Sequence, residues 1–190
     1  MKQNVTDKKQ RVLDTALMMI LENGIQSASM GKISKASGVA VGTIYHHFSS
    51  KEELVSELYK YHKMDMVNRF QNLKVGKTLK ETFYIFMKAF INYGLENPAE
   101  FEFIERFYRS PIIDDKVMQE IETAMLKDNP LVEGYFSNPE LFKDISLQSI
   151  LLFINGALVH TVRAHLSGEI DMTEKDWHHF IDMLWDGVSK

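Results

Sequence analysis

The sequence predicts an all-α protein of about nine helices, in which a three-helix head precedes a larger helical body. Three observations support this fold class. Apolar residues recur along most of the 190-residue chain at the i, i+3 and i+4 spacing of amphipathic helices. Signals that start helices, such as Ser50 with Glu53, recur throughout the chain. The alternation of apolar and polar residues that is typical of strands is scarce.

The head is expected to contain three helices, at about residues 7–23, 29–36 and 40–48. The Asn23-Gly24 pair favours the left-handed turn that ends the first helix. Ser29 is a suitable N-cap for the second helix, and Gly38 ends that helix. The third helix is short and is expected to finish near Phe48.

The body is expected to contain six more helices, at about residues 51–72, 78–95, 98–110, 114–127, 140–166 and 174–188. Ser50 caps the first of them and Thr173 caps the last. Two Asn-Pro pairs, at residues 129–130 and 138–139, bracket a segment that is expected to be irregular. The boundary between the predicted domains, 1–52 and 53–190, lies inside the first body helix, so a continuous helix is expected to join them.

Charge is distributed unevenly along the chain. The net charge is -4, but residues 1–51 contain seven Lys and Arg against three Asp and Glu. This segment therefore carries +4 and the rest of the chain carries -8. A small basic segment on an acidic body indicates local contact with nucleic acid rather than a general attraction of polyanions.

Composition excludes several other classes of protein. The chain has no cysteine, which excludes disulfides, thiolate zinc sites and a cysteine nucleophile and fits the cytoplasmic location that we expect. The first 15 residues are polar and charged, so no signal peptide is expected. No apolar stretch is expected to approach the roughly 20 residues that span a bilayer. The longest candidate, residues 150–159, is interrupted by Asn155 and Gly156.

Residues 34–48 have the spacing of a helix-turn-helix. This motif needs a small residue where the second helix crosses the first, a glycine four positions later for the turn, and an apolar residue that anchors the second helix. Ser34, Gly38 and Ile44 meet these requirements. Further apolar anchors are Ile33, Val39 and Phe48, and the residues left facing away from the core are Ala40, Val41, Thr43, Tyr45 and His46.

The stretch from Gly38 to Leu54, which reads GVAVGTIYHHFSSKEEL, closely resembles the TetR family of bacterial transcriptional regulators. The resemblance extends upstream to Gly24 and covers roughly the first third of the chain. The remainder is similar to the family in length and helical pattern. The resemblance implies a homodimeric repressor that binds a pseudo-palindromic operator in double-stranded DNA and is released by a small hydrophobic or amphipathic effector.

The resemblance also implies roles in DNA binding for eight residues: Ser29, Ala40, Val41, Gly42, Thr43, Tyr45, His46 and Lys51. Thr43 and Tyr45 would contact phosphates or base edges, and Lys51 and Ser29 would hold phosphates at the starts of helices. Many relatives have a basic or polar residue in place of Val41, whose aliphatic side chain could instead touch a thymine methyl group. Taken singly, Tyr45 could also be a core aromatic and Lys51 a solvated charge.

The body is rich in aromatic residues and methionines, which could form a helical core or enclose an apolar cavity. The resemblance favours a cavity for the effector. The residues expected to line it are Phe86, Phe90, Tyr93, Phe103, Phe107, Phe153 and His160. For His160 a buried histidine with satisfied hydrogen bonds is the alternative.

The two final helices carry apolar stripes that suit a dimer interface of four helices. The first stripe contains Ile150, Leu151, Ile154, Leu158 and Thr161, and the second contains Trp177, Phe180, Ile181, Leu184 and Trp185. Packing within the chain is the alternative interpretation of both stripes.

No catalytic or metal-binding motif accompanies these features. The chain lacks a glycine-rich phosphate loop, a nucleophile elbow and an HExxH sequence, so neither an enzyme nor a cofactor is expected. Four histidines, at 160, 165, 178 and 179, do not have the spacing of standard ligand sets, so no metal site is expected. An alternative function is a helical effector-binding or scaffold protein that acts through protein partners without specific DNA binding.

Overall fold

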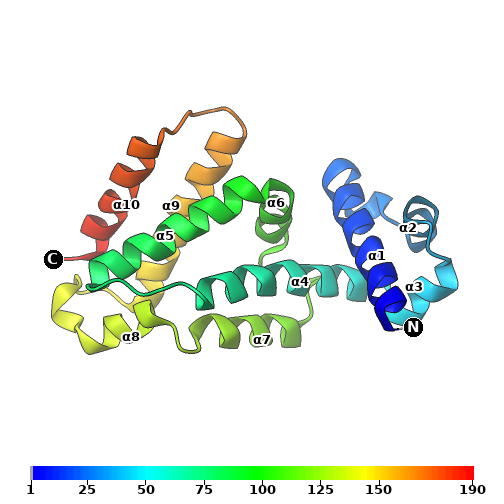
Figure 1. Cartoon of the computed structure of the whole chain (residues 1–190), viewed down its shortest axis with the longest axis horizontal. Coiled ribbons are helices and arrows are strands. Elements are labelled where there is room, and N and C mark those ends of the chain that lie inside the picture. The colour runs from blue at the N-terminus through cyan, green and yellow to red at the C-terminus, as the bar shows by residue number, and fades with distance from the viewer. Residues whose placement is uncertain (1) are drawn as a thin grey trace. The chain divides into compact units, whose positions relative to one another are not determined.

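A computed structural model describes the backbone of residues 2–190 and the side chains from residue 7 onward. Within this range the chain forms ten α-helices and two short 3-10 helices (Figure 1). The described residues contain no strand beyond one isolated bridge between Phe142 and Ser189. The prediction of an all-α fold is therefore confirmed, with one more helix than expected.

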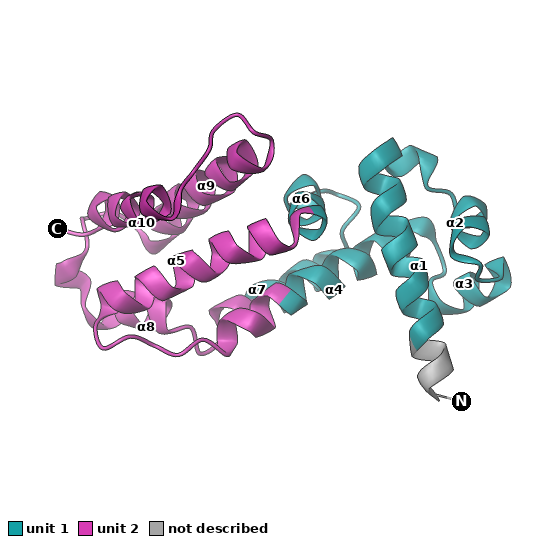
Figure 2. Cartoon of the chain, turned by 45° about the horizontal axis from the view of Figure 1, so that its top comes forward, with its two compact units in different colours: residues 1–65, 99–122 teal, residues 66–98, 123–190 magenta. Residues whose placement is uncertain are grey.

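The chain divides into two compact units, each made of two separate stretches of sequence (Figure 2). Unit 1 comprises Met1–Asp65 and Ala99–Glu122, and unit 2 comprises Met66–Pro98 and Thr123–Lys190. This structural division differs from the predicted boundary at residues 52 and 53. That boundary separates functions, and it stays a prediction.

Unit 1 begins with the helices of the predicted head, which are α1 (Lys2–Asn23), η1 (Ile25–Ser27), α2 (Met30–Ser37) and α3 (Val41–His47). The predicted bounds hold to within one or two residues, except that α1 starts earlier. The first part of α4 (Lys51–Gln71) closes this bundle. Its core consists of apolar side chains with almost no exposed surface: Val12, Ala16, Ile20, Ile33, Ile44, Phe48, Leu54 and Leu58.

Two later helices complete unit 1, α6 (Pro98–Phe107) and most of α7 (Asp115–Leu126). The rings of Phe103 and Phe107 lie 4.7 Å apart in its interior. Arg106 Nη1 donates a hydrogen bond of 3.5 Å to the carbonyl oxygen of Leu21 at the end of α1. Residues of α6 are therefore part of the same compact unit as the helix-turn-helix.

Unit 2 is organised around α5 (Leu79–Glu96), which contacts α8 (Pro130–Ser137), α9 (Leu147–Leu166) and α10 (Glu174–Val188). The Phe83 ring packs 5.3 Å from Trp185, and the Phe142 ring lies 6.1 Å from the same tryptophan. The short η2 (Pro139–Leu141) precedes Phe142. The end of α4, the loop after it and the last turn of α7 also belong to this unit.

The segment between the two Asn-Pro pairs was expected to be irregular, and this expectation is wrong. Asn129 accepts hydrogen bonds through its side chain from the backbone N–H groups of Leu131, at 3.0 Å, and Val132. Pro130 occupies the first turn, where its missing N–H is not needed. Cap and proline together start α8, and the helix expected from residue 140 starts at Leu147 instead.

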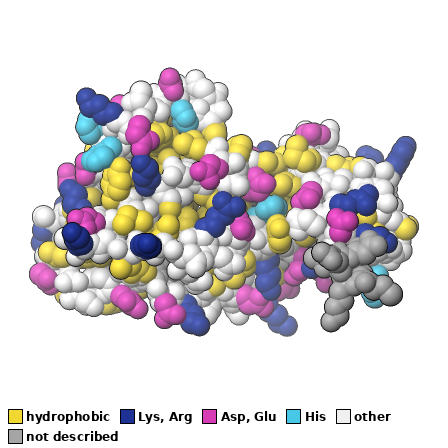
Figure 3. All heavy atoms as spheres, viewed as in Figure 1, with side chains coloured by type: hydrophobic (Ala, Val, Ile, Leu, Met, Phe, Trp, Pro, Cys, Tyr) yellow, Lys and Arg dark blue, Asp and Glu magenta, His cyan; other side chains and the backbone are white. Residues whose placement is uncertain are grey.

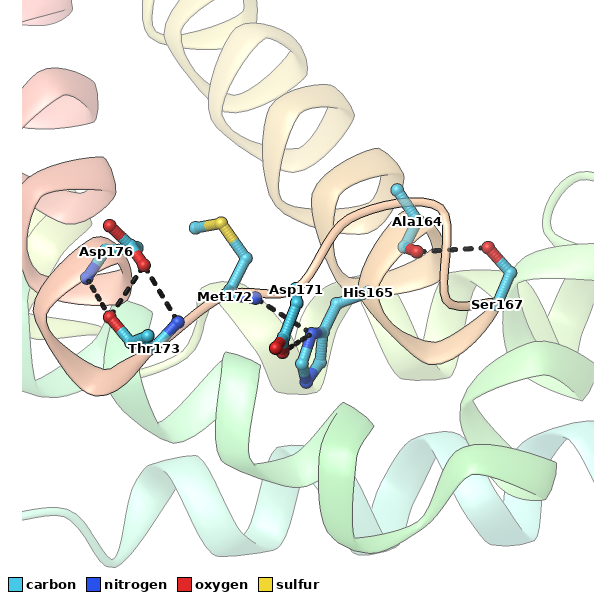
Figure 4. A network of polar contacts seen from close by, with 7 residues as sticks. All are labelled: Ala164, His165, Ser167, Asp171, Met172, Thr173 and Asp176. Carbon is cyan, nitrogen blue, oxygen red and sulfur yellow. Dashed lines mark hydrogen bonds and ion pairs between the residues drawn. The ribbon is translucent and has the colours of Figure 1, made fainter.

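The starts of α4 and α5 are capped by hydroxyl side chains. Ser50 accepts the backbone N–H of Glu53 at 3.0 Å, as expected, and Thr78 accepts that of Glu81 at 3.1 Å. The carboxylates of these glutamates, however, accept from the residue before each cap, Ser49 and Lys77. A complete capping box forms at α10, where Thr173 and Asp176 exchange hydrogen bonds (Figure 4).

The loop between α9 and α10 is held by His165 (Figure 4). Its Nδ1 accepts a hydrogen bond of 3.2 Å from the backbone N–H of Met172, and its ring meets Trp177 edge-on at 5.6 Å. The side chain of Ser167 donates to the carbonyl oxygen of Ala164 at 3.0 Å. These contacts fix the turn that returns the chain to α10.

Candidate nucleic-acid interface

The turn between α2 and α3 is closed by its own side chains. Gly38 adopts the left-handed conformation, with a φ of 66°, and ends α2. The Ser34 hydroxyl donates a hydrogen bond of 2.7 Å to the carbonyl oxygen of Val39 across the turn. The side chains of Ile44 and Phe48 are fully buried and anchor α3 to the core. The spacing predicted for a helix-turn-helix is therefore present in the structure.

The outer side of α3 is exposed. Ala40, Val41, Gly42, Tyr45 and His46 are exposed, and Thr43 is half-buried. Tyr45 is 53% exposed and Val41 is 43% exposed, both high values for bulky side chains. The structure thus excludes a core position for Tyr45, which was its alternative interpretation. The outward-facing residues of the predicted motif share one surface.

The two predicted phosphate anchors occupy the starts of helices. Ser29 is the exposed N-cap of α2, and its side chain accepts the backbone N–H of Lys32 at 3.3 Å. Lys51 is the first residue of α4, and its Nζ donates to the carbonyl oxygen of Ile25 at 3.4 Å. Lys51 is therefore half-buried and held beside η1.

His47 follows the exposed surface of α3 and is half-buried. Burial, and then the positive charges of His46 and Lys9, lower the pKa of His47 below its ordinary value. Its imidazole therefore favours the neutral form near neutral pH, whereas His46 is the histidine that points into solvent.

The basic residues of the head differ in their environments. Lys9 Nζ lies 3.2 Å from Glu57 Oε2, and Arg11 donates a hydrogen bond to the carbonyl oxygen of Ser37. Among the described side chains of the head, the exposed cations are Lys8, Arg11, Lys32 and Lys35, and the side chain of Lys2 lies outside the described residues. Figure 3 shows acidic and basic side chains interspersed on its visible face. The net charge of the head therefore overstates what it presents to a polyanion.

Three polar side chains on the inner side of α4 were missed by sequence reasoning. Tyr59 is fully buried, and its hydroxyl has no hydrogen-bond partner among the described residues. Burial lowers the pKa of Lys63 and of His62 from their ordinary values. For Lys63 the negative charge of Glu105 acts in the opposite direction but is the smaller effect. Burial also raises the pKa of Tyr59. The spacing of these three residues places them on one buried side of α4, but nothing in the sequence distinguishes them from exposed polar residues.

Unit 2 contains a hollow of about 190 Å³ beside the end of α4. Its walls are mainly apolar and include Met66, Phe70, Phe86 and Met125. Polar groups also line it, among them Gln71, Lys127, Asp128 and Asn129. An apolar interior with a few polar groups suits a small amphipathic molecule.

Of the seven residues expected to line an effector cavity, Phe86 lines this hollow. Phe90 and Tyr93 are buried elsewhere on α5, and Phe103 and Phe107 pack inside unit 1. Phe153 is 50% exposed and His160 is exposed, because the opposite side of α9 faces the core. The other walls of the hollow come from α4 and α7 and include Met66, Phe70 and Met125, which have no distinguishing pattern in the sequence. The effector-binding residues stay a prediction.

The apolar stripes predicted for a dimer lie mostly within the chain's own core. The buried members are Ile150, Ile154, Leu158, Trp177, Ile181 and Leu184, and the half-buried ones are Thr161, Phe180 and Trp185. Leu151 alone of the ten is exposed. Packing against α5 explains this, since α5 contacts both α9 and α10.

A different apolar surface of unit 2 is exposed, and we call it the α9–α10 face. It includes Leu151, Leu152 and Phe153 of α9 and Met183 of α10, with Leu152 57% and Met183 68% exposed. By length and composition alone α9 could cross a membrane, contrary to the expectation, and 28% of its apolar window is buried within the chain. Gly156 adds an open position on α9, where a Cβ would meet nothing within 4 Å.

Comparison with known proteins places this geometry in context. Residues 12–58 match the family model described as bacterial regulatory proteins, tetR family. The HTH-type transcriptional regulator QacR of Staphylococcus aureus is 24% identical over 191 residues, covering 96% of this chain and 98% of that protein. The matched segment contains α2, α3 and the exposed surface described above.

Solved structures share the fold along the whole chain. A TetR family transcription regulator from Marinobacter aquaeolei VT8 has a TM-score of 0.86 at 23% identity, covering 100% of both chains. The transcriptional regulator FadR from Bacillus subtilis, solved in complex with stearoyl-CoA, has a TM-score of 0.73 at 23% identity. That match covers 94% of this chain and 98% of the other.

Proposed function

Because this chain belongs to the tetR family of bacterial regulatory proteins, we propose that it is a homodimeric repressor whose operator binding is relieved by a small amphipathic effector. The family relationship makes the chain a DNA-binding transcriptional regulator. One observation carries the proposal: α3 exposes Val41 and Tyr45, while the buried side chains of Ile44 and Phe48 anchor it to the core.

The exposed surface of α3 suits the major groove of DNA. Thr43, Tyr45 and His46 supply hydrogen-bonding groups for phosphates and base edges, and Val41 supplies an apolar contact for a thymine methyl group. The exposed N-cap Ser29 and the helix start at Lys51 offer positions for two phosphates. In this proposal the predicted DNA-binding residues act as one surface.

A second copy of this chain is the proposed partner for the α9–α10 face. Exposed Leu152, Phe153 and Met183 would lose contact with water, and Gly156 would allow two backbones to approach closely. A two-fold axis would place two copies of α3 about 34 Å apart, or a multiple of that distance, along DNA. The expected operator is therefore pseudo-palindromic.

The hollow in unit 2 is the proposed effector site. Its apolar walls would take a hydrocarbon portion, and Gln71 or Lys127 would meet a polar head group. The stearoyl-CoA in the Bacillus subtilis FadR structure supports a ligand of amphipathic type. Met66 and Phe70 belong to α4, which is one continuous helix from Lys51. A shift of α4 caused by the effector would therefore also move Lys51, at the start of this helix. An effector releases DNA only through different affinities for the two states.

DNA binding is tested by fluorescence anisotropy with the intergenic DNA upstream of the gene. Tyr45→Ala and Lys51→Ala are expected to weaken specific binding at least tenfold, since each removes a proposed phosphate contact. Tyr108→Ala is the control, because Tyr108 is 41% exposed and lies outside the head. Unchanged specific binding by the Tyr45 and Lys51 variants would contradict the proposed interface.

The alternative, a scaffold without specific DNA binding, predicts a different result. A folded chain that binds no genomic fragment at low salt would support it. For the effector, Phe70→Ala is expected to weaken the response of operator affinity to an amphipathic ligand, without changing operator affinity in its absence. A ligand that binds the hollow and leaves operator affinity unchanged would contradict the repressor mechanism.

A further inference from the structure

We propose that Lys9 and Arg11 of α1 are positioning residues that fix the recognition helix α3, and that neither cation contacts DNA phosphate. The inference rests on the proposed function, because it concerns how the DNA-binding surface is held. It assigns to α1 a role that its basic charge alone would not indicate.

Arg11 contacts the turn that precedes α3. Its guanidinium donates to the carbonyl oxygen of Ser37, the last residue of α2. Carbonyl groups at the end of a helix carry partial negative charge and lack intrahelical partners, which makes them good acceptors for a cation. A Cβ at Gly38 would lie 3.1 Å from Arg11 Nη2, so this guanidinium rests directly against the turn.

Lys9 holds the other end of α3. Its ammonium lies 5.5 Å above the centre of the Phe48 ring, the residue that ends α3. The same ammonium lies 3.2 Å from Glu57 Oε2 on α4. Lys9 therefore connects α1 with the end of α3 and with the helix that follows.

The spacing of the two cations explains why they reach different places. Side chains two positions apart on a helix do not face each other. Arg11 reaches the turn before α3, and Lys9 reaches the residue after it. The two contacts bracket Val41–His47 at both ends and fix its orientation relative to α1.

These contacts are suited to fixing geometry rather than to supplying stability. The side chains of Lys9 and Glu57 are 41% and 35% exposed, and ion pairs at such exposure contribute little to folding. Both cations also have a partner already. A DNA phosphate would have to displace Glu57 or the Ser37 carbonyl to use them, whereas the hydrogen bond of Lys51 to the Ile25 carbonyl oxygen is long, at 3.4 Å, and is displaced more easily.

The salt dependence of operator binding tests the proposal, because each phosphate contact contributes about 0.9 to the slope of log Kd against log salt. Lys9→Met is expected to weaken specific binding about five- to tenfold with an unchanged slope. Lys9→Arg is expected to restore affinity, since arginine can make both contacts. Lys51→Met is the comparison, with a slope reduced by about 0.9.

The Glu57→Gln variant distinguishes a Lys9 that binds phosphate from a Lys9 that positions α3, because the two roles predict opposite changes in operator affinity. If Lys9 bound phosphate, removing its acidic partner would free the ammonium and strengthen DNA binding. If Lys9 positions α3 through Glu57, the variant is expected to weaken binding as much as Lys9→Met, and the double variant no further. Circular dichroism and thermal melting establish that each variant is folded.

Two outcomes overturn the inference alone: a reduced slope for Lys9→Met, or tighter operator binding by Glu57→Gln. Operator affinity that is unchanged in both variants overturns it as well. Absence of operator binding by the wild-type chain at any salt concentration would instead overturn the proposed function, and this inference with it.

Discussion

The hydroxyl of Ser56 accepts a hydrogen bond of 2.9 Å from the backbone N–H of Asp114, which joins α4 to the residue before α7 within unit 1. Ser56 is 4% exposed, so water does not replace this contact easily. Ser56→Ala is expected to lower the free energy of unfolding by about 1 kcal/mol or more, because it orphans a partly buried N–H. Urea unfolding monitored by circular dichroism measures the change.

Ser167→Ala is the matched control for this prediction. The Ser167 hydroxyl also hydrogen-bonds to a backbone group, but the residue is exposed and water can take its place. Its effect is expected to stay below about 0.5 kcal/mol. Equal losses in the two variants would show that the Ser56 contact has no special weight.

Replacing Lys63 is expected to raise the free energy of unfolding, whereas replacing Ser56 lowers it. Burial lowers the pKa of the Lys63 ammonium from the ordinary 10.5. The folded chain therefore binds this proton more weakly than the unfolded chain does, which reduces the stability of the folded state. This cost is present at neutral pH and disappears as the pH rises through 10.5. Lys63→Met is therefore expected to raise the free energy of unfolding at pH 7 by on the order of 1 kcal/mol. Thermal melting between pH 7 and pH 10 measures the difference.

The difference between Lys63→Met and wild type is expected to shrink toward the alkaline end of that range. Lys74→Met serves as the control, since Lys74 is exposed and its replacement should change little. A Lys63→Met variant less stable than wild type at pH 7 would mean that the ammonium makes a favourable contact worth more than its burial costs.

Two glycines of α2 and its turn are expected to respond in opposite directions to the same change. Gly38 has a φ of +66°, so Gly38→Ala is expected to destabilise the chain by about 1 kcal/mol or more and to weaken operator binding. Gly31 is exposed within α2, and a Cβ there meets nothing within 4 Å. Gly31→Ala is expected to stabilise by about 0.5–1 kcal/mol. Differential scanning calorimetry on both variants measures the two changes in stability. Changes of the same sign would contradict the prediction.

Leu152→Glu tests the proposed dimer. The change places a charge in the middle of the α9–α10 face, so the dimer is expected to dissociate to monomers at micromolar concentration in sedimentation or light scattering. Leu126→Glu is the control, because Leu126 on α7 is similarly exposed at 53%. A Leu152→Glu chain that stays dimeric would move the interface to another surface.

The head could be predicted in detail because its signals are local. The left-handed Gly38, the cap at Ser29 and the anchors Ile44 and Phe48 each act within a few residues, and the structure has each of them where the sequence places it. Exposure of Tyr45 then follows from its position one residue after Ile44. No comparable signal identified Tyr59 or Lys63, since a buried polar group on a helix looks like any other polar residue in sequence.

The body was less predictable because periodicity finds an apolar side without naming what covers it. Trp177, Ile181 and Leu184 form a clear stripe, yet the chain's own helices bury it. Leu152 and Met183 stand outside that periodicity and are exposed. The same limitation applies to the hollow in unit 2, because counting aromatic rings could not select Phe70 on α4, which lines it, over Phe103 on α6.

Unit 1 is discontinuous in sequence, and this has a consequence for synthesis. The helix-turn-helix shares one compact unit with residues 99–122, which the ribosome adds only after α5 has been made. At translation rates of about 5–20 residues per second, the interval between residues 65 and 122 lasts on the order of 3 to 11 s. During this time the nascent head lacks α6 and the first turns of α7, so its final cooperative folding unit forms late. A fragment ending with α4 would be left permanently in that unfinished condition.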